Sequence, residues 1–567
     1  MDNAAVAQLF DELADLLEIA GENPFKTRAY RAFAQMARER HEPLAALAAR
    51  GDLLTLPGVG KAVAARVDAV MHTGSFPALE RARAAVPEAV RRLLDVPGLG
   101  PQLVRALWKD AGIASLGELS YACEEHKLAK VEGIGPKRQA RIHAAVRSLL
   151  EQGGGALLAT ALAAARAIEA LLLEAGATDV TPLGDARRGV EVVRELVLLV
   201  RGIGAKRIAG LLSGQETLEG ALARPSADGA TLVVHGLSVR VRVVPAGEWT
   251  HAVVVGTGDA RHVAWLESKA SEHGRDLAAV CARAKTEDDV YRALGLPTIP
   301  PELREGAVDA IPADLVSLAD VCGFFHVHTD WSDGTAPILA MARAAARGGY
   351  RYLGISDHSR AAAYANGLDA DRLRDQAQAI AIARREQTGC AIFHGIEVDI
   401  LADGTLDLDD DILASLDFVI ASVHAKLVMT PEEMTARIVR AVSHPLVTIL
   451  GHPTGRLLLG RRGYAFDLEA VARAAAANDT YLEINANAQR LDLGDELVRR
   501  AAKQGARFAI DPDAHADRGI EETALGVLVA RRAGLVRDQV LNARDRDEMS
   551  VVLAARRKNA LARLGRS

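Results

Sequence analysis

The sequence predicts a protein of several domains whose last and largest part is a (β/α) barrel. At 567 residues the chain is long enough for three or four domains. Gly-x-Gly motifs recur within the first 150 residues, each followed by a helical pattern. After residue 320, seven short apolar runs alternate with Ala- and Arg-rich segments of helical character. We therefore expect a helical amino-terminal region, a mixed α/β middle region and a (β/α) barrel built on the seven runs.

Composition narrows the class of protein and its partners. The net charge of -6 argues weakly against nucleic-acid binding by the whole chain, but residues 1–150 hold 20 Lys and Arg against 18 Asp and Glu. Any DNA contact should therefore be local and amino-terminal. No apolar run approaches the roughly 20 residues of a membrane helix, and four scattered cysteines without a CxxC motif predict reduced thiols. We expect a cytoplasmic, nucleoid-associated monomer that does not bind membranes.

The amino-terminal region carries three glycine hairpins, LPGVGKAVAARV, VPGLGPQLV and VEGIGPKRQARI. One such turn between two helices is explained by the need for glycine alone. Three within one short stretch, beside basic side chains, favour helix-hairpin-helix elements that bind DNA backbone phosphates without reading sequence. The candidate DNA-binding residues are Gly58, Gly60, Lys61, Gly98, Gly100, Gly133, Gly135, Lys137 and Arg138.

These hairpins and the stretch GENPFKTRAYRAFAQ resemble the amino-terminal DNA-binding domain of family X DNA polymerases. That resemblance implies a lyase lysine at the position of Arg66, and a guanidinium cannot form the Schiff base, so we do not assign the activity. A Gly-rich break and a Pro-containing linker delimit the parts. The expected domains are residues 1–80 and 81–152 (helical), 156–295 (palm and thumb), 296–318 (linker) and 319–567 (barrel).

The middle region resembles the polymerase palm, but it departs from the pattern at the positions that matter. The family pattern implies two strand aspartates and a third carboxylate to hold two Mg²⁺ ions. Those three positions are Glu195, Val197 and Arg240, and the serine expected to bind the nucleotide phosphate is Asp185. One carboxylate beside a guanidinium cannot hold two Mg²⁺ ions. We expect nucleotide transfer to be lost.

The barrel region places ligand-type residues at the ends of its apolar runs. In FFHVHTDWSDG the two histidines are two residues apart, so both side chains point to the same face of a strand. Six of the 16 histidines in the chain close such runs, together with carboxylates. Reactive groups of a (β/α) barrel collect at the carboxyl ends of its strands. The mixed imidazole and carboxylate set suits Mn²⁺ or Zn²⁺, with Fe²⁺ a further candidate, and is too large for one ion.

The motifs HVH, SDG, SDH, GIEVDI, SVH, GHPTGR and DAH resemble the polymerase and histidinol phosphatase (PHP) domain from about residue 320 to 560. The resemblance implies a distorted (β/α)7 barrel with a metal centre of two or three ions that hydrolyses phosphoesters, and with Glu397 bridging two of the ions. The ligands it nominates are His326, His328, Asp333, His358, Glu397, His424, His452, Asp513 and His515. Arg456, just past one ligand strand, is a candidate phosphate clamp.

The favoured hypothesis is a DNA repair enzyme that processes 3′ ends, a metal-dependent 3′–5′ exonuclease or phosphatase acting on gapped or 3′-ended duplex DNA. An active gap-filling polymerase is a second hypothesis, and the missing carboxylates argue against it. A small-molecule phosphatase of the histidinol phosphate type would leave the three hairpins unexplained. A non-catalytic DNA scaffold would leave the nine ligand-type residues unexplained.

Overall fold

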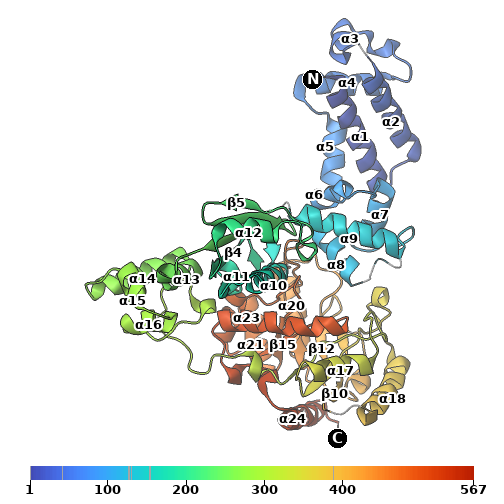
Figure 1. Ribbon diagram of the computed structural model, residues 1–567. Coiled ribbons are helices and arrows are strands. Elements are labelled where there is room, and N and C mark those ends of the chain that lie inside the picture. Colours follow the sequence, from blue (N-terminus) through green and yellow to red (C-terminus); the bar gives the residue numbers. More distant parts are fainter. Residues whose placement is uncertain are drawn as a thin grey trace. The chain divides into compact units, whose positions relative to one another are not determined.

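The computed structural model describes residues 2–40, 42–125, 128, 131–151, 155–308, 310–386 and 389–566. The chain forms two compact units, residues 1–150 and 151–567. Part of the predicted Gly-rich break, residues 152–154, lies outside the described residues. Among the helices that the structure describes, none combines the length and the apolar character needed to cross a bilayer. Figure 1 shows the course of the chain.

The first unit is helical, with one core of its own. Phe10 on the first helix packs against Phe33 and Phe76, with ring centroids 4.4 and 5.1 Å apart. Apolar side chains recur along that helix at helical spacing, which explains why one face is buried. The helices are α1 (Asn3–Ala20), α2 (Pro24–Glu39), α3 (Leu44–Arg50), α4 (Lys61–Thr73), α5 (Pro77–Ala85), α6 (Glu88–Arg91), α7 (Pro101–Lys109), α8 (Leu116–Glu124) and α9 (Pro136–Glu151).

The three glycine motifs form the same turn. The first glycine of each pair has a positive φ, 75° at Gly58, 90° at Gly98 and 85° at Gly133, where an L side chain would be strained. The apolar residue between the glycines is buried each time. Helices α4, α7 and α9 begin directly after the second glycine. The predicted helix-hairpin-helix elements are therefore confirmed.

The middle region is built on a five-stranded sheet of order β2-β4-β7-β6-β5. Strands β4 and β7 are parallel, and the other pairs are antiparallel. The strands are β1 (Ala156–Leu157), β2 (Asp179–Pro182), β3 (Val192–Val193), β4 (Glu195–Arg201), β5 (Arg224–Ser226), β6 (Gly229–Val234) and β7 (Leu237–Val243). The helices are α10 (Leu158–Glu174), α11 (Gly184–Arg188), α12 (Ala205–Leu212), α13 (Trp249–Thr257), α14 (Ala260–Glu272), α15 (Leu277–Arg283) and α16 (Glu287–Ala293).

The carboxyl-terminal region is a barrel of parallel strands, as predicted. Strands β8, β9 and β10 form one sheet and β11 to β15 form another. Parallel bridges between Val327 and Ala514 and between His358 and Glu397 join the two sheets. The strands are β8 (Gly323–Phe324), β9 (Tyr352–Ile355), β10 (Ala391–His394), β11 (Glu397–Asp399), β12 (Ile420–Ser422), β13 (Ile449–Leu450), β14 (Tyr481–Asn485) and β15 (Phe508–Asp511).

Helices follow most of these strands and cover the barrel (Figure 1). They are α17 (Ile338–Arg347), α18 (Ala370–Glu386), α19 (Asp410–Leu413), α20 (Pro431–Val442), α21 (Leu468–Asn478), α22 (Asp495–Ala502), α23 (Thr523–Arg532) and α24 (Arg546–Arg563). Strands β10 and β11 are consecutive pieces of one predicted run, interrupted at Gly395 and Ile396. A Cβ on Gly395 would lie 2.4 Å from the Phe418 ring, so only glycine fits at this break. Counted as one strand, they give the seven predicted runs.

The middle region and the barrel belong to the same unit and are joined by ion pairs. Arg456 of the barrel lies 2.5 Å from Glu191, and Arg531 lies 2.8 Å from Glu302. Arg532 on α23 lies 3.0 Å from Glu305 and also donates a hydrogen bond to the carbonyl of Arg188 on α11. Breaking a buried pair of this kind leaves an uncompensated charge. These pairs therefore hold the five-stranded sheet of the middle region, which we call the palm-like sheet, against the barrel.

Candidate metal centre

The parallel strands of the barrel bring all nine predicted ligands together at one end. Eight of the nine residues lie just after the carboxyl end of a strand or in the turn that follows, and Glu397 begins β11, the second piece of the interrupted strand. The side chains therefore meet although they span 190 positions. They form four overlapping groups whose ligand atoms lie within 4.8 Å of one another. The groups are His328, Asp333, His358 and His515; His326, His328 and Asp513; His326, Glu397 and His452; and His358, Glu397 and His424.

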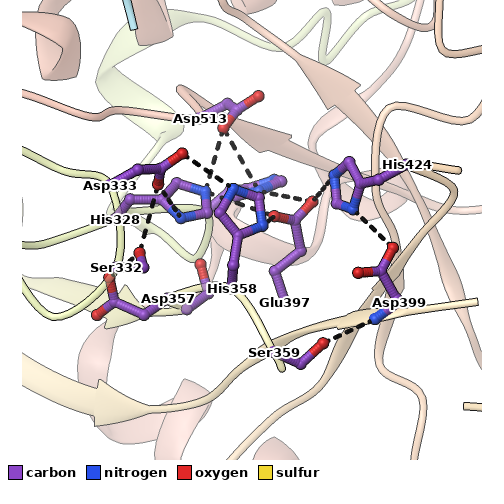
Figure 2. Close-up of polar contacts among 12 residues, drawn as sticks. His328, Ser332, Asp333, Asp357, His358, Ser359, Glu397, Asp399, His424 and Asp513 are labelled. Carbon is purple, nitrogen blue, oxygen red and sulfur yellow. Dashed lines mark hydrogen bonds and ion pairs between the residues drawn. The ribbon is translucent and has the colours of Figure 1, made fainter. Parts of the chain in front are cut away.

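The Glu397 carboxylate is the centre of the cluster. Its Oε1 lies 3.2 Å from His326 Nε2, 3.2 Å from His424 Nε2 and 3.0 Å from His452 Nε2. Its Oε2 lies 2.8 Å from His358 Nδ1. Figure 2 shows this carboxylate between the imidazoles of His358 and His424. Since its two oxygens face different histidines, the geometry is that of a carboxylate able to bridge two cations.

Asp333 and Asp513 complete the cluster on either side of His328. Asp513 Oδ1 lies 3.3 Å from His328 Nε2, and Asp333 Oδ1 lies 3.4 Å from His515 Nε2. Asp333 stands in the tight SDG turn, where a Cβ on Gly334 would lie 2.5 Å from the carbonyl oxygen of His328. Glycine in this motif therefore lets the turn fold back against the strand that carries the histidine.

The cluster fits divalent cations, because several of its buried ligand atoms form no hydrogen bond within the protein. His326 Nε2, both ring nitrogens of His328, both ring nitrogens of His358 and Glu397 Oε2 are buried and form no hydrogen bond. Buried polar atoms are normally paired, and leaving several unpaired in one place is costly. Imidazole nitrogens and carboxylate oxygens around one space are the donor set of Zn²⁺, Mn²⁺ or Fe²⁺ sites.

Two buried carboxylates outside the nine orient the ligands. Glu483 Oε1 lies 2.6 Å from His326 Nδ1, and its Oε2 accepts a hydrogen bond from the backbone N–H of His452. Asp399 Oδ1 lies 3.0 Å from His424 Nδ1. Fixing one ring nitrogen directs the other toward the cation. Neither Glu483 nor Asp399 was among the nine predicted ligands. The spacing of two between Glu397 and Asp399, which places both on one strand face, was an available signal for Asp399.

Asp357 was also missed as a functional residue. It is buried and accepts hydrogen bonds from the backbone N–H and hydroxyl of Thr329, both at 2.7 Å, and from Gln376 at 2.6 Å. The hydroxyl of Ser332, next to Asp333, also donates to it. Asp357 therefore holds the turn that carries Asp333. The aspartate directly before His358 was the available signal, but its partners are distant in sequence.

Electrostatics divide the histidines into neutral and charged members. Burial, together with the nearby imidazoles of His515 and His358, lowers the pKa of His328 to about 3. Burial opposes the charged form of His424, but the carboxylates of Glu397 and Asp399 outweigh it and raise its pKa to about 10. His328 is thus ready to ligate a cation at neutral pH. A cation that takes His424 must displace a proton, so metal binding should release protons.

Two of the nine residues stand in a strained backbone conformation. His452 has φ of 25° and Asp513 has φ of 50°, both in the left-handed region that residues other than glycine rarely adopt. Such outliers persist where the surrounding structure fixes them, and they gather at functional sites. Here Glu483 holds the backbone of His452 and Asn485 donates to Asp513 at 3.0 Å.

Arg456 does not have the surroundings expected of a phosphate clamp. Its Nε donates to the carbonyl of Arg490, and its Nη2 contacts the carbonyl of Leu491 and the carboxylate of Glu191. These contacts argue against the predicted clamp, because the Nε and Nη2 groups of Arg456 already have partners within the protein. The arginine beside the cluster is Arg490, whose Nε lies 3.4 Å from Asp513 Oδ2. Nothing in the sequence pattern singled it out.

The polymerase-like positions are engaged in ion pairs within the protein. Arg240 lies opposite Val197 on the paired strands β7 and β4, and its Nη2 lies 2.9 Å from Glu195. Asp185 pairs with Arg188 at 2.6 Å. The lone carboxylate on β4 therefore already has a cationic partner.

The basic residues of the hairpins differ in their surroundings. Lys61 at the start of α4 and Lys137 in the first turn of α9 are exposed. Arg138 donates instead to the carbonyls of Gly133 and Gly98, both at 2.8 Å, and so ties the second hairpin to the third. The two lysines, rather than Arg138, are the side chains placed to reach a ligand.

Comparison with known proteins finds family matches to three parts of the chain. A helix-hairpin-helix domain family matches residues 1–76, a SAM-like helix-hairpin-helix tandem matches residues 90–148, and the PHP domain matches residues 325–487. A probable phosphatase of Thermoanaerobacter sp. (strain X514) is 35% identical over 27% of this chain and 64% of its own length. A probable phosphatase of Syntrophotalea carbinolica is 29% identical over 38% of this chain and 90% of its own length. The DNA polymerase/3′-5′ exonuclease PolX of Bacillus subtilis (strain 168) is 32% identical, covering 98% of this chain and 99% of its own length. The chain therefore belongs to the PolX family.

Proposed function

We propose that this protein is a metal-dependent phosphoesterase that processes DNA 3′ ends in repair, by 3′–5′ exonuclease or phosphatase action in its PHP domain. The observation that carries the proposal is the buried cluster of nine histidines and carboxylates, in which ring nitrogens of His326, His328 and His358 form no hydrogen bond. The similarity to a whole-length relative named a 3′-5′ exonuclease and to probable phosphatases supports the same chemistry.

The nine residues would hold two or three divalent ions, Mn²⁺ or Zn²⁺ with Fe²⁺ as a further candidate. Bound ions of this kind lower the pKa of a water molecule and stabilise the attacking and leaving oxygens of a phosphoester. Within the protein, Glu397 would bridge two ions, while Glu483 and Asp399 keep His326 and His424 in their ligating orientation. Arg490 is buried next to Asp513, where its positive charge would offset part of the negative charge of a bound phosphate.

The helical unit would hold the DNA. Backbone N–H groups at the starts of α4, α7 and α9, following Gly58 and Gly60, Gly98 and Gly100, and Gly133 and Gly135, can bind backbone phosphates. Lys61 and Lys137 add exposed positive charge there. Such contacts would be independent of base sequence, as suits a gapped or 3′-ended duplex. We propose that the protein acts on DNA as a monomer.

Nucleotide transfer by the middle region is not part of this proposal, although the relative's name includes polymerase activity. The ion pair between Glu195 and Arg240 leaves no group of carboxylates on β4 and β7 to hold two Mg²⁺ ions. We propose that the palm-like sheet serves instead as a rigid part of the DNA-processing unit.

The test is to incubate the pure protein and a His328→Ala variant with Mn²⁺ and end-labelled gapped DNA, with and without deoxynucleotides. Shortening of the labelled strand by the natural protein and its loss in the variant are expected. A His444→Ala variant, which changes a histidine paired with Asp410 outside the cluster, is the matched control. Extension of the labelled strand when deoxynucleotides are present would contradict the loss of nucleotide transfer by the middle region. Shortening of that strand by the His328→Ala variant would contradict the role of the metal centre.

A further inference from the structure

One exposed aromatic side chain stands beside the metal centre. The ring centroid of Tyr364 lies 6.0 Å from that of His358 and 6.5 Å from that of His424. The side chain is 45% exposed. Of the Phe, Tyr and Trp residues that the structure describes between 155 and 566, it is the only one whose side chain is exposed rather than buried or partly buried. A phosphoester held by His358 and His424 would therefore have this ring as a neighbour.

The loop that carries the tyrosine is pinned to the barrel. Asp407 accepts hydrogen bonds from the Ser359 hydroxyl and the Ala361 N–H, each at 2.7 Å, and its carbonyl accepts from Arg360. Leu368 returns to the start of the loop and donates to the carbonyl of His358 at 2.7 Å. A Tyr held on a fixed loop loses little conformational freedom when a ligand packs on it.

The residues that follow Tyr364 in the loop, Asn366 and Gly367, are also held close to the barrel. A Cβ on Gly367 would lie 1.8 Å from the carbonyl oxygen of Ser359, so this position accepts only glycine. The amide of Asn366 donates to the carbonyl of Trp331, in the turn that also carries Asp333. The loop is thus tied to the metal-binding turn, and the distance between the tyrosine and the cluster is set by both.

The chemistry of an exposed ring at this distance favours a flat, unsaturated ligand. Every nucleobase has a π-face, and base stacking on an aromatic side chain tolerates any sequence. The phosphoesters of a nucleic acid are separated by single nucleosides, so a base lies next to each reacting phosphate. A phosphate monoester of a small aliphatic alcohol has no such group.

We infer that Tyr364 is the platform of a nucleobase subsite, on which a base adjacent to the scissile phosphate stacks while the phosphate lies at the cluster. This inference rests on the proposed phosphoesterase function and adds to it a subsite that binds the base, so that the nucleoside as well as the phosphate is recognised. The tyrosine acts in binding and positioning, and the metal ligands carry the chemistry.

The test uses three labelled oligonucleotides with Mn²⁺: one natural, one lacking the base of the 3′-terminal nucleotide and one lacking the base of the penultimate nucleotide. The kcat/KM of the natural protein should fall about tenfold for one of the two base-free substrates. Tyr364→Phe, which keeps the ring, should keep that discrimination. Tyr364→Leu should cut the natural oligonucleotide about tenfold more slowly and discriminate no longer.

Val428→Ala is the matched control, because Val428 is an apolar side chain, 98% exposed, on the segment that follows His424. It should discriminate as the natural protein does, and thermal unfolding of each variant checks the fold. Equal cleavage of all three substrates by the natural protein would overturn the inference alone. So would a Tyr364→Phe variant that behaves like Tyr364→Leu. Failure to cut any of the three would overturn the proposed function and this inference together.

Discussion

At the scale of single residues, Asp399 fixes one face of the metal centre without belonging to the nine predicted ligands. Its carboxylate lies 3.0 Å from Nδ1 of His424, whose Nε2 faces Glu397. We expect Asp399→Ala to weaken Mn²⁺ binding and activity by about 10- to 100-fold, since the imidazole can then rotate. Calorimetric titration with Mn²⁺ measures the binding. Asp403→Asn, in the exposed turn that follows β11, is the control. Unchanged affinity in Asp399→Ala would contradict the orienting role.

The thiols allow a second prediction at this scale. Burial raises the pKa of Cys123 and of Cys390 to about 12, whereas Cys322 is partly exposed. A thiol reacts as its thiolate, so a raised pKa means slower alkylation at any pH below it. At pH 8 iodoacetamide should therefore modify Cys322 first, which peptide mass spectrometry would show. Rapid modification of Cys123 or Cys390 in the folded protein would contradict their burial.

At the scale of elements, Glu287 at the start of α16 connects this helix to α11 and to the linker before the barrel. It pairs with Arg187 on α11 at 2.5 Å and with Arg304 in the segment that leads to the barrel. Burial alone would raise its pKa, but hydrogen bonds and the charges of both arginines outweigh burial and lower it. A carboxyl whose pKa is lowered on folding stabilises the protein at pH values above its ordinary pKa, which is 4.5 for Glu287. This stabilisation is lost as the pH falls through the lowered pKa of the folded state.

Glu287→Gln should therefore destabilise the protein at pH 7 by about 3 kcal/mol, because the buried guanidinium of Arg304 and the partly buried one of Arg187 lose their charged partner. The difference between the variant and the natural protein should shrink as the pH falls below 4.5. Thermal or urea unfolding at several pH values measures it. Glu272→Gln, which removes a partner from an exposed pair with Lys269, should change stability little. A difference that stays constant with pH would contradict the ion-pair account.

The elements that the sequence predicted are those whose signals are local. A Gly-x-Gly turn followed by a helix, or an apolar run ending in histidine, carries its own conformational preference, and both were found where expected. Contacts between distant residues carry no such signal. Glu191 and Arg456 are 265 positions apart, and only folding brings them together. That is why the sequence could nominate the nine residues of the cluster but misjudged the surroundings of Arg456.

At the scale of the whole molecule, the two compact units divide the expected work. Residues 1–150 have their own hydrophobic core and carry the three hairpins. The cluster and the palm-like sheet lie in the second unit, joined by the pairs of Glu191, Glu302 and Glu305. We expect hydrolysis of a small phosphoester to require only the second unit, whereas efficient action on DNA requires both.

The corresponding experiment compares the full chain with residues 151–567. The shorter protein should hydrolyse a small aryl phosphate at a similar kcat/KM but should show a KM for gapped DNA raised by about tenfold or more at physiological salt, because phosphate contacts dominate DNA affinity. A full-length Lys61→Glu, Lys137→Glu variant should raise the same KM and flatten its dependence on salt, since fewer counterions are released. If deletion left the KM for DNA unchanged, the hairpins would not be the DNA-binding elements. If it abolished hydrolysis of the small phosphoester in a folded protein, the second unit would depend on the first for its chemistry.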